Sequence, residues 1–205
     1  MLKKIGVGVV LIVVAFLAVV ATRPAEFHIE RSATVAAPAE VVFAQLNDLH
    51  RWSRWNPFER EDPGMKITYS GTPSGVGASY HYVGPKMGEG RMTLTESTPN
   101  ERIAVRAEFV KPMPATNLIE FTVKPAPGGV AVTWGMSGRN SFVAKAISIF
   151  LNMDEMVGGE FEKGLAELKR VSEEEAQRRA AAARAQAVAP VSAPAPARGR
   201  TVAAG

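Results

Sequence analysis

Apolar residues alternate with polar ones through most of the segment from Phe27 to Met136, and this spacing constrains the fold more than any other feature. A period of two is typical of strands that bury one face. Stretches rich in glycine and proline divide the segment into short runs. Loops this short join antiparallel neighbours and leave no room for crossover helices. The sequence therefore predicts an antiparallel sheet of about seven strands.

Helical patterns flank and interrupt these strands. Residues 38–49 (PAEVVFAQLNDL) place proline in the first turn of a short helix. Residues 50–64 (HRWSRWNPFEREDPG) predict a second, broken helix and a turn. After Met136 the apolar spacing changes to three and four, so we expect one long helix of some 30 residues, capped by Asn140 or Ser141. Gly158-Gly159 interrupts its apolar stripe, and a kink, a close approach to the sheet or room for a ligand would each explain the pair. Its apolar stripe comprises Phe150, Met153, Val157, Phe161, Leu165 and Leu168.

The N-terminus carries an apolar run, residues 5–21, without charge or proline. As a helix it would span about 25 Å, which suits a single membrane crossing. Arg23-Pro24 disfavours cleavage, so we expect an anchor in residues 1–25; the alternative is secretion after signal cleavage near Ala21. Lys3 and Lys4 predict a cytoplasmic N-terminus and an extracytoplasmic domain.

Charge and cysteine content exclude several classes of protein. The formal net charge is +4, but removing the five basic residues at the two ends leaves residues 24–197 at −1, so no nucleic-acid partner is expected. The chain has no cysteine, which excludes disulfides, thiolate metal sites and cysteine catalysis. Residues 173–186 predict a charged helical extension with Glu-to-Arg pairs four residues apart, and the Ala/Pro-rich residues 187–205 predict disorder.

Several segments together resemble one superfamily. They are ERSATVAAPAEVVFAQLNDLHRWSRWNPF near the start, GVGASY, VAVTWGMSG and the closing FEKGLAELK. In this order they resemble the START-like, Bet v 1-like (SRPBCC) superfamily, especially polyketide cyclase-like proteins with an N-terminal membrane segment. The resemblance implies an α+β helix-grip fold over residues 26–172: a curved sheet, two short helices and one long C-terminal helix. The anchor and the tail are not part of the common pattern.

The helix-grip fold implies a cavity between the sheet and the long helix. Its expected wall is apolar and methionine-rich with a few phenol hydroxyls, which suits a hydrophobic ligand; the alternative is that these side chains only fill the core. The candidates are Trp52, Trp55, Tyr69, Tyr80, Tyr82, Met92, Phe109, Phe121, Trp134, Met136, Met153, Met156 and Phe161.

Other chemistry has little support in the sequence. Asp154, on or beside the apolar stripe, is a candidate polar cavity residue: it is either a ligand-pairing or catalytic acid, or an acid at the edge of the stripe that is salt-bridged or solvated. The three histidines lack metal-ligand spacing, so neither a metal ion nor a cofactor is expected. No catalytic residue can be assigned, because nucleophile elbows, phosphate loops and dinucleotide fingerprints are missing.

These observations predict membrane-anchored binding of a hydrophobic small molecule: a lipid, an isoprenoid or a polyketide-like compound. One alternative is a cyclase- or hydrolase-like enzyme that uses the same cavity. The other is an envelope protein-interaction module that uses the C-terminal extension and tail, with an unknown protein partner.

Overall fold

The structure is a computed structural model that describes residues 2–188. The predicted disorder of the tail therefore lies, from residue 189 onward, outside the described residues. The helices are α1 (Leu2–Thr22), α2 (Ala39–Asn47), the 3-10 helix η1 (Leu49–Arg54), α3 (Pro57–Glu61), α4 (Phe142–Ile147) and α5 (Met153–Val188). The strands are β1 (Glu26–Val35), β2 (Lys66–Ser70), β3 (Ser79–Gly84), β4 (Gly88–Thr98), β5 (Arg102–Lys111), β6 (Ala115–Ala126) and β7 (Gly129–Arg139).

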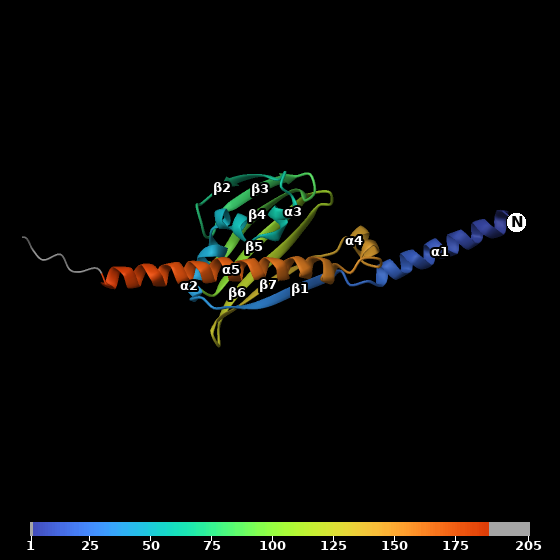
Figure 1. The fold of residues 1–205 in the computed structure, drawn as a ribbon. Helices are drawn as coiled ribbons and strands as arrows, with labels where there is room; N and C mark the ends of the chain where they lie inside the picture. The colour runs from blue at the N-terminus through green and yellow to red at the C-terminus, as the bar shows by residue number, and fades with distance from the viewer. Residues whose placement is uncertain (1, 189–205) are drawn as a thin grey trace, which may run out of the picture.

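The seven strands form one antiparallel sheet in the order β1-β7-β6-β5-β4-β3-β2. Short turns join the strands from β2 to β7, and β1 closes the sheet by pairing with β7. The predicted period of two is confirmed by the register, which places Phe121 of β6 opposite Trp134 of β7. Helix α5 lies across one face of the curved sheet (Figure 1). The helix-grip α+β fold is thus confirmed.

The tryptophan-rich segment forms a broken helix, as predicted. The carboxylate of Asp48 accepts a hydrogen bond from the His50 amide at the start of η1, and Asn56 caps α3 in the same way. The indole N–H groups of Trp52 and Trp55 donate to carbonyl oxygens in the last turn of α2, at 3.0 and 3.3 Å. These bonds hold η1 against α2 and direct both indoles into the core.

The expectation of one helix from residue 140 or 141 onward was wrong at its start. The Ser141 hydroxyl does accept a hydrogen bond from the Ala144 amide, but it caps only the short α4. The Ser148 hydroxyl bonds back to the Lys145 carbonyl, and the Asn152 side chain caps a new helix through the Glu155 amide. Short polar side chains that satisfy the backbone locally compete with helix continuation. The chain therefore breaks over residues 148–152.

The long helix α5 is continuous through the glycine pair that interrupts its apolar stripe. At Gly158 a side chain would overlap the guanidinium of Arg31, so this glycine permits a close approach to β1. At Gly159 nothing lies within 4 Å of the position that a Cβ would occupy. The pair is thus explained by one close contact and not by a kink.

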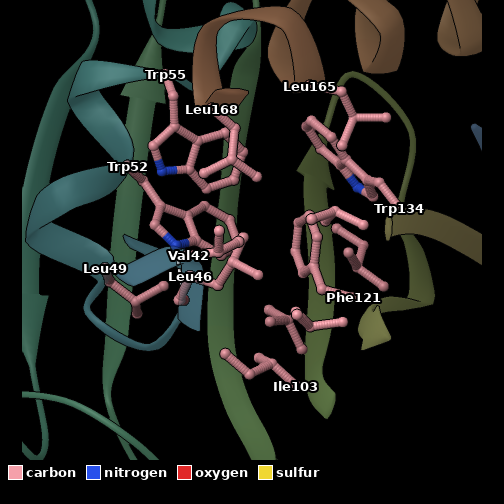
Figure 2. Packing of buried hydrophobic residues seen from close by; sticks show 14 of the residues in the cluster. Val42, Leu46, Leu49, Trp52, Trp55, Ile103, Phe121, Trp134, Leu165 and Leu168 are labelled. Carbon is pink, nitrogen blue, oxygen red and sulfur yellow. Dashed lines mark hydrogen bonds between the residues drawn. The ribbon is translucent and has the colours of Figure 1, made fainter. Parts of the chain in front are cut away.

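The core lies between the sheet and the helices α2, η1 and α5. Figure 2 shows the indoles of Trp52 and Trp55 facing Trp134 and Phe121 of the sheet, with Leu165 and Leu168 of α5 above them. Trp55, Phe121, Trp134, Leu165 and Leu168 are all buried. Because these contacts join the two layers, they fix the separation of helix and sheet at this end of the domain.

The N-terminal helix α1 is the one helix among the described residues that is long and apolar enough to cross a membrane, with a mean hydropathy of 2.9 over residues 3–22. A signal sequence would meet the same criterion. The helix leaves the domain at the end where α4 lies, opposite α2 (Figure 1). Most of its side chains are exposed.

We expect two alanine substitutions in α5 to have opposite effects on stability. Gly159→Ala adds a methyl group in open space and should stabilise the protein by about 1 kcal/mol, because alanine favours the helix. At Gly164 a Cβ would lie 2.5 Å from Trp134 and 2.9 Å from Pro57. Gly164→Ala should therefore cost about 1–3 kcal/mol through overpacking. Denaturant titration of the full-length protein in detergent, followed by tryptophan fluorescence, measures both; equal effects would contradict the assigned contact.

Candidate functional site

A cavity of about 720 Å³ lies between the sheet and α5. Its walls come from β1 and from β3 to β7 on the sheet side, from η1 and α3 at one end, and from α4 and the first turns of α5 at the other. Wall residues near η1 are buried, as at Trp52 and Tyr80, whereas those near α4 are exposed, as at Ser141 and Met153. The cavity therefore has a closed end beside η1 and a mouth beside α4.

The structure brings most of the predicted cavity residues together. The ones that line the cavity are Trp52, Tyr80, Tyr82, Met92, Phe109, Trp134, Met136, Met153 and Phe161, together with Asp154. Contact of these residues with a ligand remains a prediction.

Four predicted residues lie outside the cavity wall. Trp55 and Phe121 are fully buried and pack edge to face with ring centroids 5.8 Å apart, so they fill the core beyond the closed end. Tyr69 lies on β2 at the edge of the sheet and stacks on His50 at 3.9 Å. Met156 is exposed on the outer side of α5. Alternation and helical spacing identify a face, but they do not show how far along that face the cavity extends.

Other wall residues were missed by the sequence reasoning. Asn117 and Ile119 share the inward face of β6 with Phe121, so extending the alternation would have found them. The sequence offers Asp48, Glu59, Glu61 and Asp62 near the tryptophan segment either as paired carboxylates at the cavity mouth or as a solvated loop; of these four, the structure places Glu59 in the cavity wall. The further wall residues include Phe27, Ile29, Phe58, Met65, Met87, Met113, Ala144 and Val157.

Two polar atoms in the cavity wall have no hydrogen-bond partner within the described part of the chain. The Trp134 indole nitrogen is a buried donor without an acceptor, unlike the nitrogens of Trp52 and Trp55. The Asn117 carbonyl oxygen is a buried acceptor without a donor, and its amide nitrogen makes only a 3.7 Å contact with the Met136 sulfur. Buried polar groups are usually satisfied. The wall therefore offers one free donor and one free acceptor in otherwise apolar surroundings.

Burial favours the uncharged forms of three ionisable side chains in the cavity wall: Tyr80, Tyr82 and Glu59. Burial raises the pKa of Tyr82 to about 12, and burial, together with the nearby Glu59 charge, raises the pKa of Tyr80 well above its usual value. Burial also raises the pKa of the Glu59 carboxyl, opposed in part by a hydrogen bond from Asn56 at 3.5 Å. Near neutral pH the two phenols are therefore hydrogen-bond donors and not bases.

Asp154 at the mouth forms an ion pair. Its carboxylate accepts hydrogen bonds from the Arg31 guanidinium at 2.9 and 3.2 Å, and Glu162 accepts another from Arg31 at 2.9 Å. The hydrogen bond from Arg31 holds the pKa of Asp154 below its usual value. Asp154 is thus ionised and engaged by Arg31, which fits the salt-bridged alternative. The cluster ties the first turns of α5 to β1.

The described residues contain no group of three or more histidine or acidic side chains placed to hold a metal ion. The histidines make separate local contacts: His28 with Glu30, His81 with Glu89, and His50 with Asp48 and Tyr69. Of these three histidines, His28 lies in the cavity wall, and its imidazole is paired with Glu30.

Comparison with known proteins identifies the domain. Residues 26–173 match the family model described as "Polyketide cyclase / dehydrase and lipid transport". No curated protein matches.

Solved structures show the same fold at low sequence identity. A protein from Chromobacterium violaceum superposes with a TM-score of 0.54 at 18% identity, covering 71% of this chain and 96% of that one. The Aha1 dimer from Colwellia psychrerythraea gives 0.52 at 16% identity, with coverages of 72% and 96%. The di-domain ARO/CYC StfQ from the steffimycin biosynthetic pathway gives 0.55 at 10% identity, with coverages of 75% and 52%.

Identities this low establish the shared fold alone, whereas the family model covers more than half of the chain and agrees with the observed sheet, helix and cavity. This chain belongs to the polyketide cyclase / dehydrase and lipid transport family.

Proposed function

We propose that this protein binds a hydrophobic small molecule, such as a lipid, an isoprenoid or a polyketide-like compound, in the cavity between the sheet and α5. The observation that carries the proposal is the cavity itself: about 720 Å³, walled mainly by aromatic, aliphatic and methionine side chains. Ligand sites of about 300–1,000 Å³ with apolar walls and a few polar groups are typical of small-molecule binding. The family description, which includes lipid transport, supports the same class of ligand.

The polar groups of the wall narrow the chemistry of the ligand. The free indole N–H of Trp134 suits a carbonyl, ether or hydroxyl oxygen, and the free oxygen of Asn117 suits a hydroxyl or N–H donor. In the sheet register Trp134 lies opposite Phe121, and Met136 lies opposite Ile119. Asn117 comes before Ile119 and Phe121 on the same face of β6, so it lies closer to the mouth than Trp134 does. A ligand that satisfies both groups is a mainly apolar molecule that carries a hydrogen-bond acceptor for the Trp134 indole and, nearer the mouth, a donor for Asn117.

We further propose that α1 anchors the protein in a membrane, with a cytoplasmic N-terminus and an extracytoplasmic domain. The length and hydropathy of α1 support an anchor, and Lys3 and Lys4 before it support that orientation. A hydrophobic ligand is most concentrated in the bilayer, so tethering would hold the cavity close to its supply. Cleavage near Ala21 is the alternative, and the N-terminal sequence of the mature protein decides between them.

Filling the cavity should remove the ligand. Ile119→Trp places an indole in the cavity, whereas Leu118→Trp on the next residue of β6 points to the opposite, exposed face. Native mass spectrometry of the full-length protein, purified from its host membrane in mild detergent, should show a co-purifying small molecule in the wild type and in Leu118→Trp. The Ile119→Trp variant should lose it. Retention of the same mass by a folded Ile119→Trp protein would refute the cavity as the binding site.

A second candidate function, an enzyme of the cyclase type, rests on Glu59. A carboxyl in the cavity wall whose pKa is raised by burial is a candidate general acid or base. If the protein transforms its ligand, Glu59→Gln should accumulate the substrate, and the molecule that it carries should differ in mass from the one carried by the wild type. A carrier gives the same mass in both proteins.

The raised pKa of Glu59 makes a separate prediction for stability. The folded protein binds the proton of the Glu59 carboxyl more tightly than the unfolded chain does. This proton binding stabilises the fold fully below pH 4.5, and the stabilisation is lost as the pH rises through the pKa of Glu59 in the folded state. Relative to wild type, the Glu59→Gln variant should therefore gain free energy of unfolding from about pH 4.5 toward neutrality. Denaturation at several pH values measures this difference. A difference that does not change with pH would contradict the burial of the carboxyl.

A further inference from the structure

An apolar surface surrounds the cavity mouth on the outer side of α4 and the start of α5. The side chains involved are large, hydrophobic and exposed, and Phe150 is 77% exposed. We call this surface the mouth patch; its members are Phe142, Val143, Phe150, Leu151, Met153 and Met156. Contiguous apolar surfaces of this kind mark sites of association with a protein, a membrane or a ligand.

The mouth patch is continuous with the apolar surface of α1. Helices α1 and α4 are in contact, and the rings of Phe16 and Phe150 stack with their centroids 6.2 Å apart. Arg23 and Pro24, directly after α1, line a hollow together with residues 148–153. Figure 1 shows α4 beside the C-terminal end of α1, at the same end of the domain. Whatever surrounds the last turns of α1 therefore also surrounds the mouth patch.

The position of Phe16 gives the depth of the contact. Phe16 precedes the end of α1 at Thr22 by six residues, which is about 9 Å along a helix axis. Side chains of interfacial helices are buried about 5–10 Å into the boundary between headgroups and acyl chains. If α1 spans the bilayer, Phe150 thus lies at the depth of that boundary.

The same short helix faces both the cavity and the outside. Ser141, Ala144 and Ser148 line the cavity, while Phe142 and Val143 between them are exposed on the outer surface. Met153 belongs to the cavity wall and to the mouth patch. The mouth patch and the cavity wall therefore adjoin each other at α4 and at Met153.

From these contacts we infer that the mouth patch inserts into the lipid bilayer that holds α1, so that the cavity opens at the boundary between headgroups and acyl chains and not to bulk water. The inference rests on the proposed anchoring by α1. It assigns α4 a role in binding lipid, and it predicts that the ligand enters from the membrane without crossing the aqueous phase.

Site-specific fluorescence in vesicles tests the inference directly. The chain has no cysteine, so single substitutions give unique labelling sites on the full-length protein. We would attach an environment-sensitive dye at Val143→Cys and at Phe150→Cys, and reconstitute the protein in phosphatidylcholine vesicles that contain nitroxide-labelled lipid. Val76→Cys is the matched control, because Val76 and Val143 are 55% and 56% exposed and Val76 lies in the β2–β3 loop. Leu11→Cys in the middle of α1 reports on the anchor itself.

We expect nitroxides high on the acyl chain to quench most of the fluorescence at positions 143 and 150 and to leave position 76 unquenched. If position 11 is quenched and positions 143 and 150 are not, α1 lies in the membrane but the mouth patch does not, and the inference is wrong while the proposed anchor stands. Loss of quenching at all of these positions would overturn both. The two proposals can be tested independently. If Ile119→Trp loses the ligand while the quenching at positions 143 and 150 is unchanged, the cavity binds the ligand and the mouth patch contacts the membrane whether or not a ligand is bound.

A functional measurement complements the labelling. Val143→Asp and Phe150→Asp place charge where the boundary between headgroups and acyl chains is expected, so both should reduce the fraction of protein that carries the co-purifying molecule in native mass spectra. Val76→Asp should leave that fraction unchanged. Equal loading of the three variants would contradict entry of the ligand through the patch.

Discussion

The packing of α5 against Trp134 is the contact on which the rest of the domain depends. The Phe161 ring stacks on the Trp134 indole at 4.3 Å, and Gly164 brings the helix backbone so close that no side chain fits between them. Behind this contact, Trp55 and Phe121 fill the space between the layers (Figure 2). Because interiors are close-packed, these aromatic rings determine how near the helix can come to the sheet, and they close one end of the cavity.

A second attachment holds the same stretch of α5 by charge, beside the aromatic one, because Arg31 is the cross-strand partner of Trp134. Arg31 of β1 reaches across the helix over Gly158 and pairs with Asp154 and Glu162. From these two neighbouring contacts the cavity extends toward α4, and α5 contributes Met153, Asp154, Val157 and Phe161 to its wall. Exposed ion pairs contribute position here more than stability.

The cavity and the N-terminal helix meet at one end of the molecule. The closed end is formed by η1 and the aromatic core, and the mouth is bordered by α4, which contacts α1. The cavity wall offers neutral phenols, one unsatisfied donor and one unsatisfied acceptor among mainly apolar side chains, and the ionised Asp154 at the mouth is paired with Arg31. Such a wall favours an apolar molecule with few polar groups, and anchoring by α1, as proposed, would hold the mouth beside a bilayer in which such a molecule dissolves.

The sequence by itself determined the seven strands, the broken tryptophan-rich helix, most of the long C-terminal helix and the apolar N-terminal helix, because each depends on local periodicity, capping or length.

Only the tertiary structure decided which inward residues line the cavity. Trp52 and Trp55 lie three positions apart in one segment, yet one lines the cavity and the other is core; Ile119 and Phe121 differ in the same way. Periodicity identifies the face of an element, but depth along that face depends on where α5 and the sheet diverge. The wall carboxyl of Glu59, the pairing of Asp154 with Arg31 and the contact of α4 with α1 likewise depend on segments far apart in the chain, which no local pattern encodes.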